Sequence, residues 1–192
     1  MENEIEKIKF EGFPKIPRLS KEMVITEKLD GTNGFIQITA SGEFLLGSRN
    51  KWLRVEGGKV ASDNHGFGEW ALKNKEELMK LGTGKHFGEW VGEGINKRRD
   101  YNLSDRQFVL FNVGRWNDEN KPDCCKVVPV LYRGTFCTEK IKEVMSDLKR
   151  NGSAFSKGYV DVEGIVIYHE ASKQLFKKTY DYDESGKGEN NG

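Results

Sequence analysis

The sequence predicts an α+β domain made mainly of antiparallel β-sheets flanked by helices. Segments with the apolar pattern of strands outnumber helical segments, and the two kinds do not alternate as in a parallel βαβ sheet. Glycine-containing turns follow the first strand-like segments, which is typical of antiparallel connections. The chain has 192 residues, of which 36% are hydrophobic and 32% charged. These numbers are sufficient for one domain with its own core.

No linker-like stretch divides the chain. Residues 1–21 are a charged lead-in with a loop around Pro14 and Pro17. We expect one domain over residues 1–182 and a loose tail over residues 183–192, because the tail is rich in Gly, Glu, Lys and Asn,.

The first half of the chain is expected to contribute three strands and a helix. The strand-like segments are residues 23–28, 35–39 and 43–46. Residues 31–34 and the pair Ser41-Gly42 separate them and favour antiparallel connections,. A helical pattern follows over residues 64–81, with Asn64 or Asp63 as the candidate N-cap,.

The second half of the chain is expected to contribute the remaining strands and a second helix. Strand patterns cover residues 86–91, 107–113, 126–131, 162–168 and 174–180. Thr138 is the candidate cap of a helix that runs to about Lys149,. The apolar residues of this segment fall on one helical face; they are Ile141, Val144, Met145 and Leu148,.

Bulk properties exclude several classes of protein. No apolar run approaches the roughly 20 residues that span a membrane, and the acidic N-terminus lacks the order of a secretory signal. Three cysteines do not form a disulfide framework and indicate reduced thiols in a cytoplasmic protein,. The net charge is only +1, so any nucleic-acid binding must come from a local patch.

The stretch Glu27-Lys28-Leu29-Asp30-Gly31-Thr32-Asn33 is the strongest functional signal. It follows the apolar strand segment, and Asp30-Gly31 favours a turn that presents Lys28 at the edge of a pocket. The motif resembles the nucleotide-attachment site of covalent nucleotidyltransferases, where an unprotonated lysine amine attacks the α-phosphate of a nucleoside triphosphate. On this segment alone, the alternative is a hairpin turn with an exposed lysine.

Two segments carry the letters Phe-Gly-Glu-Trp, at residues 67–70 and 87–90. Glu69 precedes a polar helical stretch, where an acidic residue favourably meets the helix dipole, so we assign it a structural role. Glu89 lies in a strand pattern before a glycine-rich segment, and glycines permit a close approach of the backbone to a ligand. We expect Glu89 to accept hydrogen bonds from ribose hydroxyls.

Three further segments carry candidate ligand-binding side chains. Arg49 can offer a fixed fork of donors to a sugar or phosphate, or be an ordinary turn arginine. Phe111 lies in an apolar strand segment and can stack on a purine or belong to the core,. Lys177 and Lys178 face opposite ways in a strand, so one of them can face the pocket,.

Glu163 is the acid in an otherwise apolar strand segment. A buried carboxylate without a partner is costly, so Glu163 needs a divalent cation or the nucleophilic lysine beside it. The alternative is a glutamate at a strand edge in water.

Taken in order, these motifs resemble the ATP-dependent RNA ligase family, which belongs to the covalent nucleotidyltransferase superfamily with DNA ligases and capping enzymes. The resemblance extends from about Phe13 to Lys187. It implies the nucleotidyltransferase (ligase adenylation domain) fold, ATP and Mg²⁺ or Mn²⁺ as cofactors, and RNA as the partner. It implies that Lys28 is adenylylated and that Glu163 binds the metal. The implied nucleotide-binding residues are Glu27, Asp30, Asn33, Arg49, Glu89, Phe111, Glu163, Lys177 and Lys178.

Some positions distinguish this chain within the superfamily. Asn33 stands where DNA ligases and capping enzymes usually carry arginine, which favours RNA ligases. The last motif usually holds two lysines one residue apart, but Lys177 and Lys178 are adjacent, so Lys178 or Lys187 is left for the second role. Asn112 replaces an aspartate of many relatives.

The last expectation concerns the contacts with nucleic acid. We expect no appended OB or helical domain, so phosphates would be contacted by Lys97, Arg98 and Arg99, or an accessory protein would assist,. A solvated loop is the alternative for this basic triplet. The expected function is an ATP-dependent RNA ligase acting on RNA ends or a nicked duplex. The alternatives are a minimal DNA ligase, a binding module that does not join strands and, less favoured, a GTP-using capping enzyme.

Overall fold

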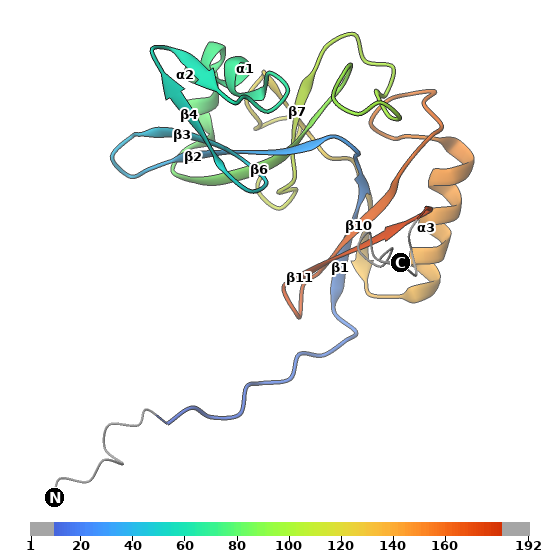
Figure 1. Ribbon diagram of the computed structural model, residues 1–192. Coiled ribbons are helices and arrows are strands. Elements are labelled where there is room, and N and C mark those ends of the chain that lie inside the picture. The colour runs from blue at the N-terminus through green and yellow to red at the C-terminus, as the bar shows by residue number, and fades with distance from the viewer. Residues whose placement is uncertain (1–9, 182–192) are drawn as a thin grey trace, which may run out of the picture.

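The computed structural model describes residues 10–181, which fold into two β-sheets with helices on their outer sides (Figure 1). Residues 10–21 lead into the first strand without regular secondary structure. The expected tail over residues 183–192, including Lys187, lies outside the described residues.

The smaller sheet has the strand order β11-β10-β1-β9 and is antiparallel throughout. Its strands are β1 (Glu22–Lys28), β9 (Val130–Thr135), β10 (Gly164–His169) and β11 (Gln174–Thr179). Helix α3 (Thr138–Asn151) buries its apolar stripe against this sheet. The packed residues include Ile25 of β1, Val144 of α3 and Ile165 of β10, so the predicted helical face is confirmed.

The larger sheet has the strand order β5-β4-β3-β2-β6-β7-β8. Its strands are β2 (Thr32–Ile38), β3 (Phe44–Ser48), β4 (Trp52–Glu56), β5 (Lys59–Ala61), β6 (Gly84–Val91), β7 (Gln107–Leu110) and β8 (Cys125–Val127). Every pairing is antiparallel except β7 with β8. One face is covered by α1 (Phe67–Lys73), α2 (Lys75–Leu78) and the 3₁₀ turn η2 (Met79–Leu81).

A third apolar cluster lies where the chain passes from one sheet to the other. Leu29 follows β1, and it packs with Val91 of β6, Val109 of β7 and Tyr101. Gly31 makes this crossing possible, since a Cβ there would lie 2.3 Å from the Trp90 carbonyl oxygen. The cluster fixes the position of the Lys28 strand end relative to the larger sheet.

The α+β class and its mainly antiparallel sheets are confirmed, with corrections to individual elements. The segments 23–28 and 35–39 do not form a hairpin, because β1 and β2 belong to different sheets. The single strand expected over residues 126–131 divides at Val128-Pro129, since Pro129 has no N–H to donate to a sheet ladder,. Strands β4 and β5 were not predicted, because their short segment is largely exposed and polar.

The helix boundaries also differ from the prediction. The helix expected over residues 64–81 is divided into α1, α2 and η2, and α1 begins after Gly66. Asp63 still satisfies the free helix donors, because its carboxylate accepts the Gly68 and Glu69 N–H groups,. Glu69 lies in the first turn of α1, as predicted. Cys137, and not Thr138, precedes α3.

Candidate active site

A cavity of about 620 Å³ lies between the two sheets at the end of β1. Both sheets contribute to its lining, because β1 ends on one sheet and β2 begins the other. Most of the predicted nucleotide-binding residues border this cavity; they are Glu27, Lys28, Asn33, Arg49, Glu89, Phe111, Glu163 and Lys177. The fold therefore brings together residues that are up to 150 positions apart in the sequence, as for Glu27 and Lys177.

Lys28 and Glu163 form an ion pair in this cavity, with 2.6 Å between Lys28 Nζ and Glu163 Oε2. Lys28 ends β1, and its partner in the ladder is Gly164, the residue after Glu163. Gly164 is required here, since it has φ +150° and a Cβ would lie 2.1 Å from the Lys178 carbonyl oxygen. The Glu163 side chain is only 8% exposed and that of Lys28 23%, so the lysine remains accessible from the cavity.

Glu89 and Asn33 lie opposite each other on β6 and β2. The Glu89 carboxylate accepts hydrogen bonds from the Asn33 side-chain amide at 2.7 Å and from the Gly31 N–H at 3.1 Å. Burial raises the pKa of Glu89 to about 7, although Lys28 nearby opposes the shift,. A carboxyl group with such a pKa is available as both acceptor and donor near neutral pH.

Glu27 borders the cavity, but its carboxylate is hydrogen-bonded to the loop after α3. It accepts hydrogen bonds from the Ser153 hydroxyl at 2.6 Å and from the N–H groups of Ala154 and Phe155. Burial raises its pKa, and these donors act in the opposite direction,. Glu27 thus anchors the loop after α3 against β1, one residue before Lys28. Its expected contact with the nucleotide stays a prediction.

Asp30 and the basic triplet need correction. Asp30 does not border the cavity; its carboxylate pairs with Arg99 at 2.8 Å, and its N–H donates to the Tyr101 hydroxyl at 2.7 Å. The Arg99 side chain is 4% exposed and also pairs with Asp161 and Asp181. It is therefore a buried structural cation and not a surface contact for phosphates.

The other two members of the triplet differ from Arg99. Arg98 is half exposed and pairs with Asp161 and Asp181. Lys97 is exposed. Sequence reasoning missed the Arg99 cluster because its carboxylates come from segments more than 60 residues away.

The two adjacent lysines of β11 have different environments. Lys177 lies opposite Val166, and both border the cavity. Lys178 lies opposite Ile165, which packs in the core beneath α3. Because paired residues share a face of the sheet, Lys178 is on the α3 side. The expected contact of Lys178 with the nucleotide is corrected accordingly.

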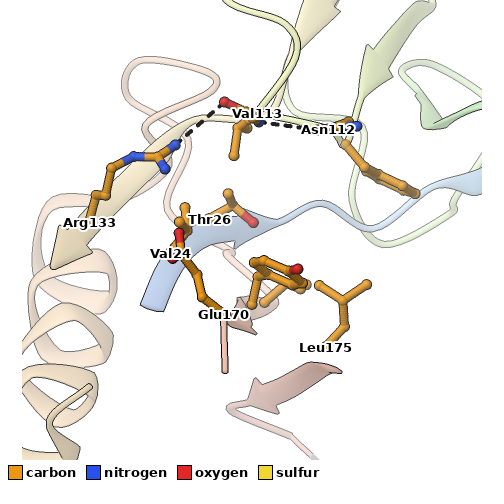
Figure 2. A pocket seen from close by; sticks show the side chains of 11 residues that line it. Val24, Thr26, Asn112, Val113, Arg133, Glu170 and Leu175 are labelled. Atoms are coloured by element: carbon orange, nitrogen blue, oxygen red, sulfur yellow. Dashed lines mark hydrogen bonds between the residues drawn. The ribbon is translucent and has the colours of Figure 1, made fainter. Parts of the chain in front are cut away.

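A second cavity of about 450 Å³ adjoins the first. The two share Thr26, Phe111, Val166 and Leu175, so Phe111 lies at their common boundary. Figure 2 shows Arg133 reaching across this second cavity to the Val113 carbonyl group, at 3.4 Å. Phe111 is 40% exposed and is therefore available for stacking with a base, one of its two predicted roles.

The donor set around the cavity can be compared with the needs of a metal ion. Among residues 10–181, no group of three or more His, Cys, Asp or Glu side chains could hold a metal ion by itself. The carboxylates of Glu89 and Glu163 border the same cavity. Mg²⁺ is commonly bound through one or two carboxylates together with substrate phosphates, so the site fits a metal that arrives with a nucleotide.

Two other sequence-based expectations can be compared with the described chain. The three cysteines are free thiols. Within residues 10–181, no helix has the length and apolar character needed to cross a membrane.

The fold is similar to that of known proteins. A Naegleria gruberi RNA ligase matches with a TM-score of 0.59 and 22% identity, over 83% of this chain and 50% of that chain. The same organism's RNA ligase with ATP and Mn matches with a TM-score of 0.60 and 23% identity, over 82% and 48%. An archaeal ATP-dependent RNA ligase matches with a TM-score of 0.54 and 19% identity, over 88% and 48%.

The chain thus spans about half the length of these solved structures, and their likeness shows the nucleotidyltransferase fold. No match is found among curated proteins. The sequence model that describes the RNA ligase family matches residues 21–179, which include every residue assigned to the cavity. The chain therefore belongs to the RNA ligase family.

Proposed function

We propose that this protein is an ATP-dependent RNA ligase that joins 5′-phosphate and 3′-hydroxyl ends through a covalent lysyl-AMP intermediate on Lys28. The observation that carries the proposal is the position of Lys28 in a cavity of about 620 Å³, paired with Glu163. Solved relatives described with ATP, AMP and Mn support the choice of nucleotide and of a divalent metal.

The first step forms the intermediate. The unprotonated amine of Lys28 attacks the α-phosphate of ATP, the bond to the β-phosphate breaks, and pyrophosphate leaves. Lys177, on β11 of the same sheet, borders the same cavity and can stabilise charge on the phosphates,. When bound, Mg²⁺ or Mn²⁺ neutralises phosphate charge, and Glu163 and Glu89 are the carboxylates that would hold it.

The same geometry assigns a role to the Lys28–Glu163 pair before reaction. At 2.6 Å the carboxylate holds Lys28 at the end of β1 in one orientation. Lys28 must lose its proton before attack, and Glu163 is in direct hydrogen-bonding contact with that proton. Glu163 is therefore a positioning group for the nucleophile in the free protein.

Two further steps complete the reaction. The AMP group passes from Lys28 to the 5′-phosphate of an RNA end, which forms a 5′–5′ pyrophosphate linkage. A 3′-hydroxyl then attacks that 5′-phosphate and AMP leaves. Arg49, Asn33 and Glu89 border the cavity, which supports the proposal that they contact the ribose and base of the nucleotide.

The test is covalent labelling with ATP labelled at the α-phosphate in the presence of Mg²⁺. The wild-type protein should become labelled, and Lys28→Ala should carry no label above background. Lys142→Ala is the matched control, because Lys142 is an exposed lysine of α3. Labelling of Lys28→Ala equal to that of the control variant would contradict the proposal.

A second assay identifies the polymer. Labelled protein should transfer AMP to 5′-phosphorylated RNA and seal it to a 3′-hydroxyl end. Sealing of nicked DNA in preference to nicked RNA would favour a DNA ligase instead. Binding of ATP without covalent transfer would favour a binding module.

A further inference from the structure

Three aromatic rings are grouped on the open face of the larger sheet. The ring centroids of Phe35 and Trp52 are 5.1 Å apart, and those of Phe35 and Phe87 are 5.4 Å apart. The Phe87 side chain is 50% exposed and Trp52 is 52% exposed. With Lys85, these residues form what we call the aromatic platform. Contiguous exposed apolar patches are typical of binding surfaces.

The platform lies on the opposite face of the sheet from the core cluster under α1 and α2, and within it Phe35 is 9% exposed, whereas Trp52 and Phe87 are about half exposed. Ile36, the next residue after Phe35, points to the opposite face and packs in the core that includes Phe67 of α1,. Leu53, next to Trp52, does the same. The rings of the platform therefore occupy the side of the sheet that α1 and α2 do not cover.

A glycine of the neighbouring strand β3 leaves room for the Phe35 ring. Gly47 of β3 lies opposite both Phe35 and Trp52 in the ladder. A Cβ at Gly47 would lie 2.1 Å from the Phe35 ring. The glycine allows this ring to lie flat over β3, between Trp52 and Phe87. The rings of β4, β2 and β6 are inclined to one another, at 71° for Phe35 and Trp52 and 49° for Phe35 and Phe87. The exposed rings at the two ends of the group, Trp52 and Phe87, offer faces on which bases can stack,.

The charged amine of Lys85 lies close to all three rings. Lys85 Nζ lies 4.7 Å from the Phe35 ring centroid, 5.5 Å from that of Trp52 and 5.8 Å from that of Phe87. Arg54 is exposed on the same face as Trp52, two residues along β4,. A cation beside stacking rings suits a polymer in which bases alternate with phosphates.

The platform is continuous with the candidate active site. Asn33 and Glu89 are paired on β2 and β6, and Phe35 and Phe87 are the next pair on the same face. Two residues of a strand span about 7 Å. Phe111 joins the two regions, since its N–H donates to the Phe87 carbonyl group and its side chain borders the nucleotide cavity. A polymer whose end lies in the cavity can thus continue onto the platform.

We propose that the aromatic platform binds unpaired RNA nucleotides next to the end that is being joined. The choice of RNA as the polymer rests on the proposed ligase function. Every base has a π-face, so stacking on Trp52 and Phe87 is independent of sequence. Paired bases within a duplex are already stacked on each other, so the platform selects single-stranded segments.

Fluorescence of Trp52 offers a direct test. Trp90 and Trp116 are buried and Trp70 is partly buried, whereas Trp52 is half exposed. Titration of the full chain with a single-stranded RNA of mixed sequence should quench the exposed emission. A blunt RNA duplex of the same length should not quench it. Equal quenching by the duplex, or none by the single strand, would overturn the proposal.

Variants of Trp52 and Lys85 distinguish a loss of RNA binding from a loss of the fluorescence signal. Trp52→Phe should retain binding of fluorescently labelled single-stranded RNA but lose the quenching signal. Trp52→Ala should weaken that binding by about tenfold, the usual size of one stacking contact. Lys85→Ala should weaken binding and lower the slope of log affinity against log salt by about 0.7, the loss of one phosphate contact. The control is Lys142→Ala, on the distant helix α3.

Circular dichroism checks that each variant is folded, and Lys85→Ala tests the surface without removing a ring. Unchanged affinity in both Trp52→Ala and Lys85→Ala would overturn the proposal. Labelling by ATP alone should be unchanged in both, because neither residue borders the nucleotide cavity. Failure of labelling with intact RNA quenching would contradict the ligase function only, so the two proposals can fail separately.

Discussion

At the scale of single residues, the candidate site is defined by two buried carboxyl groups with different partners. Glu163 is paired with Lys28, whereas Glu89 accepts two hydrogen bonds and, among residues 10–181, forms no ion pair. Desolvation disfavours the ionised form of a group, and only a close opposite charge compensates for it. Glu89 therefore has a pKa of about 7 and carries a cost to stability when ionised.

This cost predicts a pH dependence of stability. The folded state holds a proton on Glu89 up to about pH 7, whereas the unfolded chain loses it near 4.5. Folded protein thus binds more protons between these values, and the stability contributed by this group falls as pH rises from 4.5 to 7. Glu89→Gln removes the titration, because the Gln side chain does not ionise in this range, and its amide oxygen can still accept the hydrogen bond from Asn33,.

We expect Glu89→Gln to gain stability relative to wild type by on the order of 3 kcal/mol across this window. Urea unfolding at pH 4.5 and pH 7.5 measures the change. The variant should at the same time lose adenylylation activity. Parallel pH profiles for the two proteins would contradict the assignment.

At the scale of elements, one arginine connects three segments that carry site residues. Arg99 binds Asp30, which is two residues after Lys28, and Asp161, which is two residues before Glu163. It also binds Asp181, just after β11, the strand of Lys177. A buried guanidinium needs several acceptors, and here they come from the ends of the elements that form the site.

Replacement of Arg99 by Met should therefore be strongly destabilising. It keeps the aliphatic stem but leaves Asp30 without its cation, and we expect a loss of about 2–4 kcal/mol in the free energy of unfolding. Arg98→Met is the matched control. Arg98 is 53% exposed and shares Asp161 and Asp181 but not Asp30, so its loss should be less than about 1 kcal/mol. Equal losses in denaturant unfolding would show that burial of Arg99 does not matter.

The local sequence predicts that some elements exist, but it does not predict which sheet each strand joins. The apolar face of α3 follows from its spacing, and β10 follows from its continuous apolar run. The division of residues 126–131 between two sheets could not be predicted, because it depends on the strands that each half finds as partners. The same holds for β1 and β2, which the turn at residues 31–34 places in different sheets.

At the scale of the whole molecule, the nucleotide cavity lies between the sheets and has walls from both. A ligand that bridges two units stabilises the folded state by mass action, because the unfolded chain has no such cavity. For Lys28→Ala, which cannot form the covalent adduct, ATP with Mg²⁺ at 100 times the dissociation constant should stabilise the protein by about 2.7 kcal/mol.

This gain should raise the melting temperature by several degrees in thermal unfolding of Lys28→Ala. A nucleoside without phosphates should give a smaller increase, because Lys177 and the two carboxylates with their metal would have no phosphate to bind. An equal increase with both ligands would contradict the assignment of Lys177 to the phosphates.

The sequence by itself determined the class of fold and the family resemblance, and it predicted Lys28, Glu89, Glu163 and Lys177 as site residues, which border one cavity in the structure. These depend on short motifs and on the period of apolar residues, which are local properties of the chain. Only the tertiary structure decided where side chains point when two choices were open. It turned Glu27 to the loop after α3, Lys178 to the α3 face and Arg99 into the interior. For Glu27 and Arg99, the physical reason is that their partners are distant in sequence, and a charged side chain takes the orientation in which folding supplies its partner,. For Lys178, the reason is its register opposite Ile165.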